Sequence, residues 1–533
     1  MTITSFKFLG FIIAALALYW VIPAKGRRWV LLAASILFYL SFSFAGIFVM
    51  IGTSLLAFGA GILIQKYKDG YSLWLSENKK TADKETRKSV KASYQKKQKL
   101  IAAAFIAVTV GILFMCKYYK VLAADISSIF DLKLWSAENI LLPLGISYYS
   151  LQLIGYVVDV NRDIIPAEKN PLNVILYGGF FLSIMQGPFN RYNDLMPQIC
   201  SDERKTLTLY QVRGALLRIL GGYIKKLCIA DQFGVYTAEV FNNYQNYSGL
   251  GILFGIFCFA VQLYADFSGY MDIVVGIGQL FGIKMPENFR QPFFSKNMSE
   301  FWKRWHITLG LWLQDYVFYP ILKSALFKKM RDSLTKKFGK NAGRNIPTYI
   351  GMFILWVLIG AWHGAGFNYV FGVGILQFIY IFLGEIFEPV FKKIKALLKI
   401  DDKKLYWHVF QSLRCTALMM FAWVFFNSQS MGAALGMIKR LIAVPSLGQF
   451  LTVMYSGAVN GGFVRNFMLI AVGAVCVIAV DLLHEKGKTV SGIISRTPYA
   501  VRLAFYLVLI FGLIIFGAYG EQYIASNFIY FEF

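Results

Sequence analysis

Two histidines carry the chemistry that this sequence can perform in apolar surroundings. The chain has only four histidines, and His306 and His363 stand in tryptophan-rich, apolar stretches. An ionisable side chain is costly there and needs a reason to be present. A neutral imidazole has a pKa of about 6.5 and can accept a proton from a hydroxyl while uncharged at rest. The pair predicts a buried proton-handling site, although a lone buried histidine is more often structural.

The stretch around His306 predicts a helix over residues 299–316. Glu300 and Arg304 are four residues apart and form an ion pair on one side of that helix. Tryptophans at a membrane interface are the alternative explanation for the aromatic content. Helical spacing places four residues together on an apolar face: Trp302, His306, Leu309 and Leu313.

A third polar cluster interrupts the long apolar run 249–280. Carboxylates inside such a run face a cavity, a partner or an ion. We expect Asp266 and Asp272 to bond to Arg290 or Arg304 across a helical bundle. Histidine and cysteine patterns with metal-ligand spacing are absent from the sequence, so no metal site is predicted. The cluster comprises Asp266, Ser268, Tyr270 and Asp272, in a stretch that begins at Gln262.

The composition is that of a membrane protein that crosses the bilayer many times. Of 533 residues, 57% are hydrophobic and 16% are charged, whereas roughly a quarter are charged in soluble domains. In lipid, a helix pairs its own backbone N–H and C=O groups by hydrogen bonds, so the composition predicts an all-α fold. The net charge of +25 gathers in short segments between apolar spans, a pattern that sets membrane orientation and does not indicate nucleic-acid binding.

A bilayer needs about 20 apolar residues per helix, which predicts about 11 transmembrane helices with additional re-entrant or interfacial ones. The segments 212–229 and 293–322 are expected to be re-entrant or partly embedded. The candidate spans are 8–22, 29–45, 47–64, 100–122, 140–160, 171–184, 249–280, 346–359, 368–387, 406–426, 467–483 and 501–519.

The lysine-rich segments 66–99, 323–344 and 392–404 are expected to be cytoplasmic loops that set topology and contact anionic lipid. Both chain termini are then expected outside the cytoplasm. We expect a single membrane domain over 1–533. It divides into N-terminal spans (1–122, with the basic loop 66–99), a core (140–390) and C-terminal spans (391–533).

Several motifs in one order resemble a known family. The chain resembles the membrane-bound O-acyltransferase superfamily, and within it the membrane subunits of alginate and peptidoglycan O-acetyltransferases. The resemblance implies a helical ring around a thinned core crossed by a tunnel, with a cytoplasmic acyl thioester entering from one side and an acceptor hydroxyl from the other. The motifs lie at 143–148, 155–160, 187–191, 225–231, 262–272, 287–292, 300–306, 362–364 and 527–533.

The same resemblance implies roles for individual residues. His363 matches the active-site histidine of the family and would act as general base or transiently receive the acyl group. His306 matches the second histidine and would orient the thioester or stabilise its oxyanion. The residues expected to support the site are Trp302, Arg304, Trp305, Asp315, Trp362, Asn288, Gln262, Asp266, Ser268 and Asp272.

The expected function is transfer of an acyl group, first of all acetyl, to a hydroxyl of an extracytoplasmic partner or cell-surface polysaccharide, in a bacterial cytoplasmic membrane. No cofactor is bound; acetyl-coenzyme A or an acyl carrier protein is the co-substrate. Expected partners are an extracytoplasmic acetyltransferase or polysaccharide machinery and membrane lipids, with no nucleic acid. After Pro320 the sequence departs from the relatives' pattern, which leaves D-alanyl transfer to teichoic acid open. A non-catalytic transporter or flippase is the alternative from another class.

Overall fold

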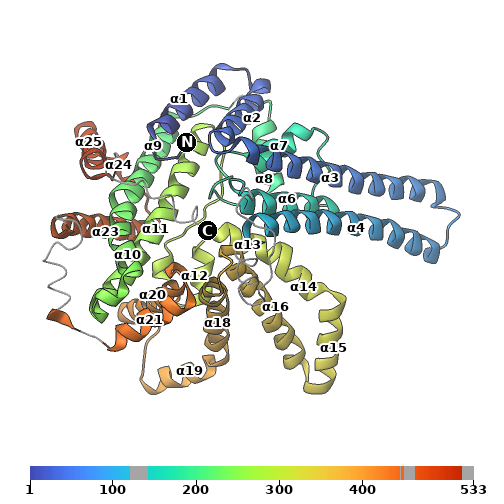
Figure 1. The fold of residues 1–533 in the computed structure, drawn as a ribbon. Helices are drawn as coiled ribbons and strands as arrows, with labels where there is room; N and C mark the ends of the chain where they lie inside the picture. Colours follow the sequence, from blue (N-terminus) through green and yellow to red (C-terminus); the bar gives the residue numbers. More distant parts are fainter. Residues whose placement is uncertain (120–141, 204, 444–445, 449–462, 519–533) are drawn as a thin grey trace, which may run out of the picture. The chain divides into compact units, whose positions relative to one another are not determined.

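The computed structural model describes residues 1–119, 142–203, 205–443, 446–448 and 463–518, without the side chains of 463–470. All regular elements in these ranges are helical (Figure 1), and the only strand-like feature there is one isolated bridge between Phe289 and Trp305. The all-α prediction is therefore confirmed. The motif at 527–533 and the ends of the predicted spans 100–122, 140–160 and 501–519 lie outside the described residues.

The chain groups into two compact units, and the first comprises Met1–Val212 with Ile277–Pro286. Side-chain caps start several of its helices: Ser43 accepts a hydrogen bond from the Gly46 amide, and Asp83 accepts one from the Thr86 amide. The helices of this unit are α1 (Phe6–Val21), α2 (Ala24–Leu40), α3 (Phe44–Asn78), α4 (Lys84–Lys117), α6 (Ile146–Asn161), α7 (Pro171–Gly179) and α8 (Tyr192–Cys200).

Two features of the first unit differ from the prediction. The basic segment 66–99 is not a loop, because α3 continues to Asn78 and α4 starts at Lys84. Its lysines and glutamates are good helix formers, so polarity alone did not end the helix. The expected span 171–184 is also wrong, since α7 ends at Gly179 after nine residues. A glycine pair at this end lowers helix propensity and allows the chain to turn.

The second unit comprises Arg213–Gly276 and Glu287–Phe533. It holds most of α9 (Leu209–Tyr223) and α11 (Gly249–Leu280). Its other elements are η1 (Ile224–Ala230), α10 (Asp231–Asn242), η2 (Tyr244–Asn246), η3 (Pro292–Phe294), α12 (Met298–Arg304), α13 (Ile307–Leu313), η4 (Gln314–Phe318), α14 (Tyr319–Lys323), α15 (Ala325–Phe338), α16 (Lys340–His363), α17 (Phe367–Tyr369), η5 (Val370–Ile375), α18 (Leu376–Ile386), α19 (Glu388–Leu397), α20 (Leu405–Asn427), α21 (Met431–Ala443), α23 (Phe463–Glu485), α24 (Val490–Ile494) and α25 (Tyr499–Phe516).

Within the described residues, seven helices are long and apolar enough to cross a membrane, which makes the chain a multi-pass membrane protein. The remaining predicted spans include α1, α2 and α6, which have only 16 or 17 residues where about 20 are needed to cross the hydrocarbon upright. The second basic segment, 323–344, is also helical instead of a loop. It forms α15 and the start of α16, joined at Gly339, whose φ of 87° suits glycine.

A buried ion-pair cluster ties α11 to the helices that precede it. Lys226 on the π-helix η1 bonds to Asp266 on α11 and to Asp231, both at 2.7 Å. The side chains of Lys226 and Asp266 are each only 2% exposed. Such a buried cation needs both carboxylates, because removing a partner leaves its charge uncompensated.

Asp272 lies further along α11 than Asp266. It pairs with Arg218 at 3.0 Å and with Lys225 at 2.8 Å. The prediction that these carboxylates bond to Arg290 or Arg304 is therefore wrong. The physical reason is proximity: the cations of α9 and η1 lie against α11, whereas Arg304 is engaged by other carboxylates.

The ion-pair cluster predicts that Asp266→Asn destabilises the protein strongly. The substitution leaves the Lys226 ammonium with one carboxylate in a buried site, which costs roughly 3 kcal/mol or more. Thermal unfolding of the purified protein in detergent should show a midpoint lowered by several degrees. Glu388→Gln is the control, because the Lys392–Glu388 pair is more than half exposed on both sides and contributes at most about 1 kcal/mol. Equal midpoints for the two variants would contradict the structural role of the cluster.

Candidate active site

The backbone turns sharply at His306. α12 ends at Arg304 and α13 begins at Ile307, so the continuous helix predicted over 299–316 is wrong. His306 itself has a φ of 48°, in the left-handed region that a non-glycine residue rarely adopts. A short antiparallel pairing imposes the turn: the Arg290 amide donates to the Arg304 carbonyl at 2.9 Å, and the Ile307 amide donates to the Asn288 carbonyl at 3.0 Å.

The side chain of Asn288 fixes the protonation of His306. The backbone amide of Thr308 donates to Asn288 Oδ1 at 3.0 Å, which identifies that atom as the oxygen, and Thr308 Oγ1 donates to it at 2.9 Å. His306 Nδ1 lies 3.2 Å from the same oxygen and must therefore carry the hydrogen. Burial lowers the pKa of His306 to about 3. The ring is neutral at physiological pH, with its lone pair on Nε2.

The two predicted catalytic histidines both lie beside the indole ring of Trp362. The His306 ring centroid is 6.2 Å from that of Trp362, and the Trp362 centroid is 5.0 Å from that of His363. Phe267 of α11 packs edge-on against His306 at 4.9 Å, and Phe426 of α20 packs edge-on against His363 at 5.6 Å. The structure thus brings together two segments that are more than fifty residues apart in the chain, in a largely aromatic surrounding.

His363 is the last residue of α16 and is only 5% exposed. Glycines on both sides of it allow close packing. A Cβ on Gly360 would lie 2.7 Å from the Val370 Cα, and a Cβ on Gly364 would lie 2.5 Å from the Tyr369 ring. Because real Cβ atoms do not approach so closely, these two positions require glycine if η5 and the Tyr369 ring are to keep their places beside His363.

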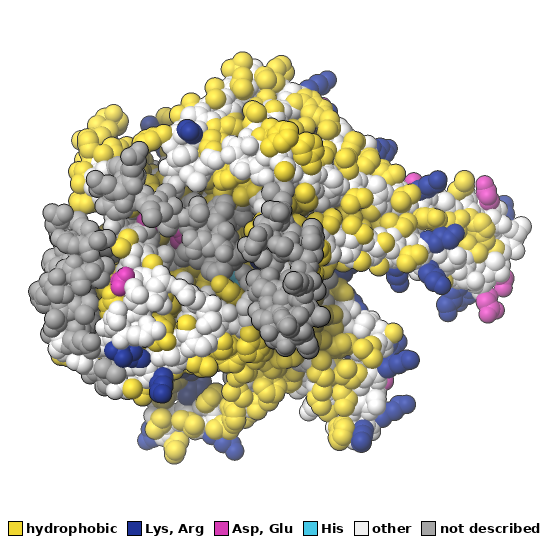
Figure 2. Space-filling view, in the orientation of Figure 1, with side chains coloured by type: hydrophobic (Ala, Val, Ile, Leu, Met, Phe, Trp, Pro, Cys, Tyr) yellow, Lys and Arg dark blue, Asp and Glu magenta, His cyan; other side chains and the backbone are white. Residues whose placement is uncertain are grey.

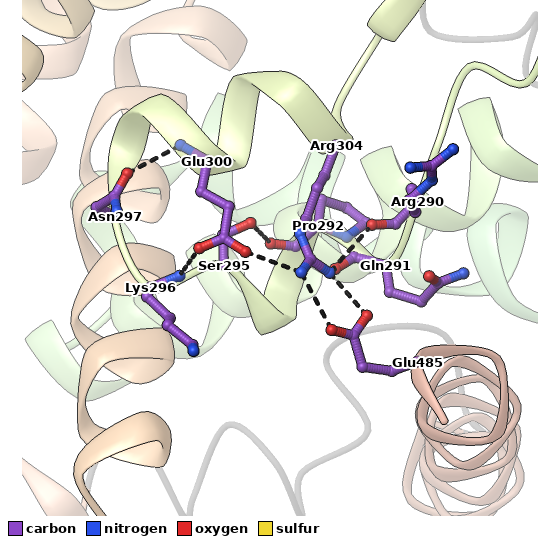
Figure 3. A network of polar contacts seen from close by, with 9 residues as sticks. All are labelled: Arg290, Gln291, Pro292, Ser295, Lys296, Asn297, Glu300, Arg304 and Glu485. Atoms are coloured by element: carbon purple, nitrogen blue, oxygen red, sulfur yellow. Dashed lines mark hydrogen bonds and ion pairs between the residues drawn. The ribbon is translucent and has the colours of Figure 1, made fainter. Parts of the chain in front are cut away.

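Arg304, two residues before His306, anchors the turn (Figure 3). Its guanidinium donates to both carboxylate oxygens of Glu485, at 2.7 and 3.1 Å, and pairs with Glu300 at 2.8 Å. It also reaches the carbonyls of Arg290 and Gln291, at 3.5 and 3.4 Å. The predicted Glu300–Arg304 pair is confirmed. A planar fork of five donors suits such convergent contacts.

The other predicted site residues are divided between this site and its surroundings. Trp302 donates to Gln377 Oε1 at 3.2 Å, and Trp305 packs against Trp423 at 5.4 Å. Asp315 is exposed on η4. Asp266 and Asp272 belong to the ion-pair cluster, while Gln262 and Ser268 lie on the same helix α11. Over the described ranges, no three histidine, cysteine, aspartate or glutamate side chains gather closely enough to hold a metal ion.

Sequence reasoning missed four residues that contact the site. Thr308 had a weak signal, because a threonine two residues after a turn often bonds to a neighbouring side chain. Phe267 and Phe426 had none, since apolar runs contain many phenylalanines. Glu485 is 181 residues from Arg304 along the chain, and one sequence offers no signal for such a pair.

A model of the MBOAT, membrane-bound O-acyltransferase family, matches residues 37–335, a range that includes His306 and ends before His363. The chain is 33% identical to a probable alginate O-acetylase AlgI of Pseudomonas aeruginosa over 46% of this chain and 43% of that protein.

Two further relatives carry other names. A peptidoglycan O-acetyltransferase of Helicobacter pylori is 27% identical over 57% of this chain and 58% of its own length. A teichoic acid D-alanyltransferase of Bacillus subtilis is 32% identical over 49% of this chain and 63% of its own length. The chain spans about half the length of the first curated relatives that it matches.

The family model covers more than half of the chain. Its range contains α11, the Asn288 side chain and the turn at His306. The chain therefore belongs to the membrane-bound O-acyltransferase family.

Proposed function

We propose that this chain is a membrane O-acyltransferase whose site is formed by His306 and His363. The observation that carries the proposal is the pair of buried imidazoles that both lie beside Trp362, in a chain of this family. The donor is a cytoplasmic acyl thioester, acetyl-coenzyme A or an acyl carrier protein. The acceptor is a hydroxyl of an extracytoplasmic partner or of a cell-surface polysaccharide.

His363 is the proposed general base. It takes the proton of the acceptor hydroxyl as the oxygen attacks the thioester carbonyl, and a tetrahedral intermediate forms. When the intermediate collapses, the carbon–sulfur bond breaks and the leaving thiolate receives the proton from the imidazolium. The products are an ester and a thiol, and the histidine returns to its neutral form. Aromatic neighbours such as Phe426 and Trp362 exclude water, which would otherwise hydrolyse the thioester.

The hydrogen bond from His306 to Asn288 favours an orienting role for His306. With its hydrogen on Nδ1, the neutral ring can accept a hydrogen bond at Nε2 but cannot donate one there. Stabilising an oxyanion would require a second proton, which burial opposes. We therefore propose that His306 Nε2 accepts a hydrogen bond from a substrate donor other than the reacting hydroxyl, whose one hydrogen goes to His363, and thereby orients the substrate toward the thioester carbon.

Acetyl is the acyl group that we propose, because two of the three relatives described above are named for acetyl transfer. The name of the third keeps D-alanyl as the second candidate. The lysine-rich segments face the cytoplasm by the positive-inside rule, which places both chain termini outside a bacterial cytoplasmic membrane. Delivery to the polymer then involves an extracytoplasmic acetyltransferase as partner.

His363→Gln tests the base, since glutamine keeps hydrogen bonding but cannot accept the proton. Transfer of labelled acetyl from acetyl-coenzyme A into alkali-labile ester, in membranes with equal amounts of protein, should fall by about a hundredfold or more. His408→Gln is the matched control and should stay within about twofold, because His408 bonds to the Asp402 carbonyl in an exposed position. Undiminished label in His363→Gln would rule out the proposed mechanism.

Asn288→Asp tests the protonation of His306 through the pH dependence of kcat/KM. A carboxylate beside Nδ1 favours the charged imidazolium and raises the His306 pKa above its present value of about 3. Both His306 and His363 must be neutral for activity, so the acidic limb follows the higher of their two pKa values. The carboxylate makes His306 that group, and the acidic limb should move to higher pH by about one unit or more.

Thr308→Val is the matched control for Asn288→Asp. It removes one donor from the same oxygen without adding charge, so the acidic limb should keep its position even if the maximal rate falls. An acidic limb that stays in place in Asn288→Asp would show that the Asn288 contact does not govern the protonation of the catalytic site.

A further inference from the structure

The outer part of the α3–α4 hairpin, residues 65–99 (here called the arm), is an ordered structure. Tyr94 of α4 packs against Tyr67 and Tyr71 of α3, with ring centroids 6.4 and 5.9 Å apart. The Tyr94 ring also fills the space that a Cβ on Gly70 would approach within 3.3 Å. These contacts join the two helices beyond their apolar halves. A segment that only set membrane topology would not need them.

The arm is strongly basic. It contains eleven lysines and arginines against four acidic residues, which leaves a net charge of +7. In the space-filling view, basic side chains line the projecting hairpin and continue toward its end (Figure 2). Among the residues that the structure describes, none forms an ion pair with the exposed lysines of the arm. These exposed lysines are Lys66, Lys79, Lys80, Lys84, Lys88, Lys91, Lys96, Lys97 and Lys99.

The lysines fall into two groups by their distance from the apolar stretches, which end at Ile64 and resume at Leu100. Lys88 is twelve residues from Leu100, or about 18 Å along the helix at 1.5 Å per residue. Lys66 and Lys99 lie within about 3 Å of the boundary by the same measure. The headgroup layer extends about 5–7 Å beyond the hydrocarbon. The lysines near the apolar stretches, such as Lys66 and Lys99 (the lower group), therefore lie at the lipid headgroups. The lysines near the end of the hairpin, such as Lys88 (the upper group), lie beyond the headgroups.

Lipid does not account for the upper group. Electrostatic attraction to the membrane surface is screened within about 8 Å at physiological ionic strength, and an arm that continues the axes of its spans holds Lys80, Lys84 and Lys88 farther out than that. A small phosphate-containing ligand needs donors that converge on one point. Lysines spread around the end of a helical hairpin diverge, which suits an extended acidic surface.

We infer that the tip of the arm, Lys80, Lys84 and Lys88, docks a soluble acidic protein that carries the acyl thioester. This inference rests on the proposed function, which requires a cytoplasmic thioester donor. Charge complementarity supports the choice of partner, because an acidic surface would be attracted from a distance and held by several exposed ion pairs. Two antiparallel helices joined by aromatic contacts hold these charges in fixed positions.

The test compares two triple variants with equal loss of charge in the full-length protein in nanodiscs. The tip variant is Lys80→Gln, Lys84→Gln and Lys88→Gln, and the base variant is Lys66→Gln, Lys96→Gln and Lys99→Gln. The probe is a purified acyl carrier protein loaded with acetyl thioester, and its Kd is measured in zwitterionic and in anionic nanodiscs. We expect the tip variant to raise the Kd about tenfold, the base variant to change it less than about twofold, and added salt to remove the difference.

Several outcomes would overturn the inference. They are no binding by the unmodified protein, equal weakening by both variants, and loss of binding in anionic nanodiscs, which would show that the arm lies on the membrane. Acetyl transfer from acetyl-coenzyme A, measured on the same samples, should be unchanged in the tip variant because that donor bypasses the arm. Tip-dependent binding in a protein that transfers no acetyl group would support docking of the carrier protein at the arm and contradict the proposed function. The two claims can therefore fail separately.

Discussion

One buried oxygen, Oδ1 of Asn288, determines what the site around His306 can do. It accepts hydrogen bonds from His306 Nδ1, from the Thr308 amide and from Thr308 Oγ1. The amide contact makes the identity of the atom unambiguous, and the imidazole contact then fixes the tautomer. The same residue also accepts the Ile307 amide at its backbone carbonyl. A single asparagine thus sets both the turn of the chain and the proton position on the ring.

The turn at His306 is a strained arrangement that the surrounding structure holds in place. A left-handed non-glycine residue costs roughly 1–2 kcal/mol, and such residues persist where their neighbours overdetermine the conformation. Here the neighbours are the backbone pairing on both sides of His306 and the Arg304 guanidinium, which joins the turn to Glu300 and to Glu485 of α23. The ion-pair cluster of Lys226 and Asp266 in turn ties α11, with Phe267, to η1.

The sequence alone predicted the elements that depend on composition and missed those that depend on contacts. Apolar runs located α11 and α20 almost to their ends and the central part of α16, because hydrophobic length is a local property. The polar continuations of α3 and α4 were missed, because charged residues were taken to mark the end of each helix. They mark only the point where the buried part of the helix ends. The histidines were found from their apolar surroundings. The break between α12 and α13, which separates Trp302 from His306, could not be predicted. It is imposed by the backbone pairing with residues 288–290 and not by the sequence of the helix itself.

The most direct measurement is a structure of the protein with a non-reactive thioether analogue of the acyl donor. We predict that the acyl carbon lies beside Trp362, with room for an acceptor oxygen about 3 Å from that carbon and within hydrogen-bonding distance of the His363 imidazole. An analogue bound with its acyl carbon away from both imidazoles would contradict the account. So would a His306 ring that donates to the acyl oxygen from Nε2 while Asn288 Oδ1 still accepts from Nδ1, because that ring would have to carry a charge.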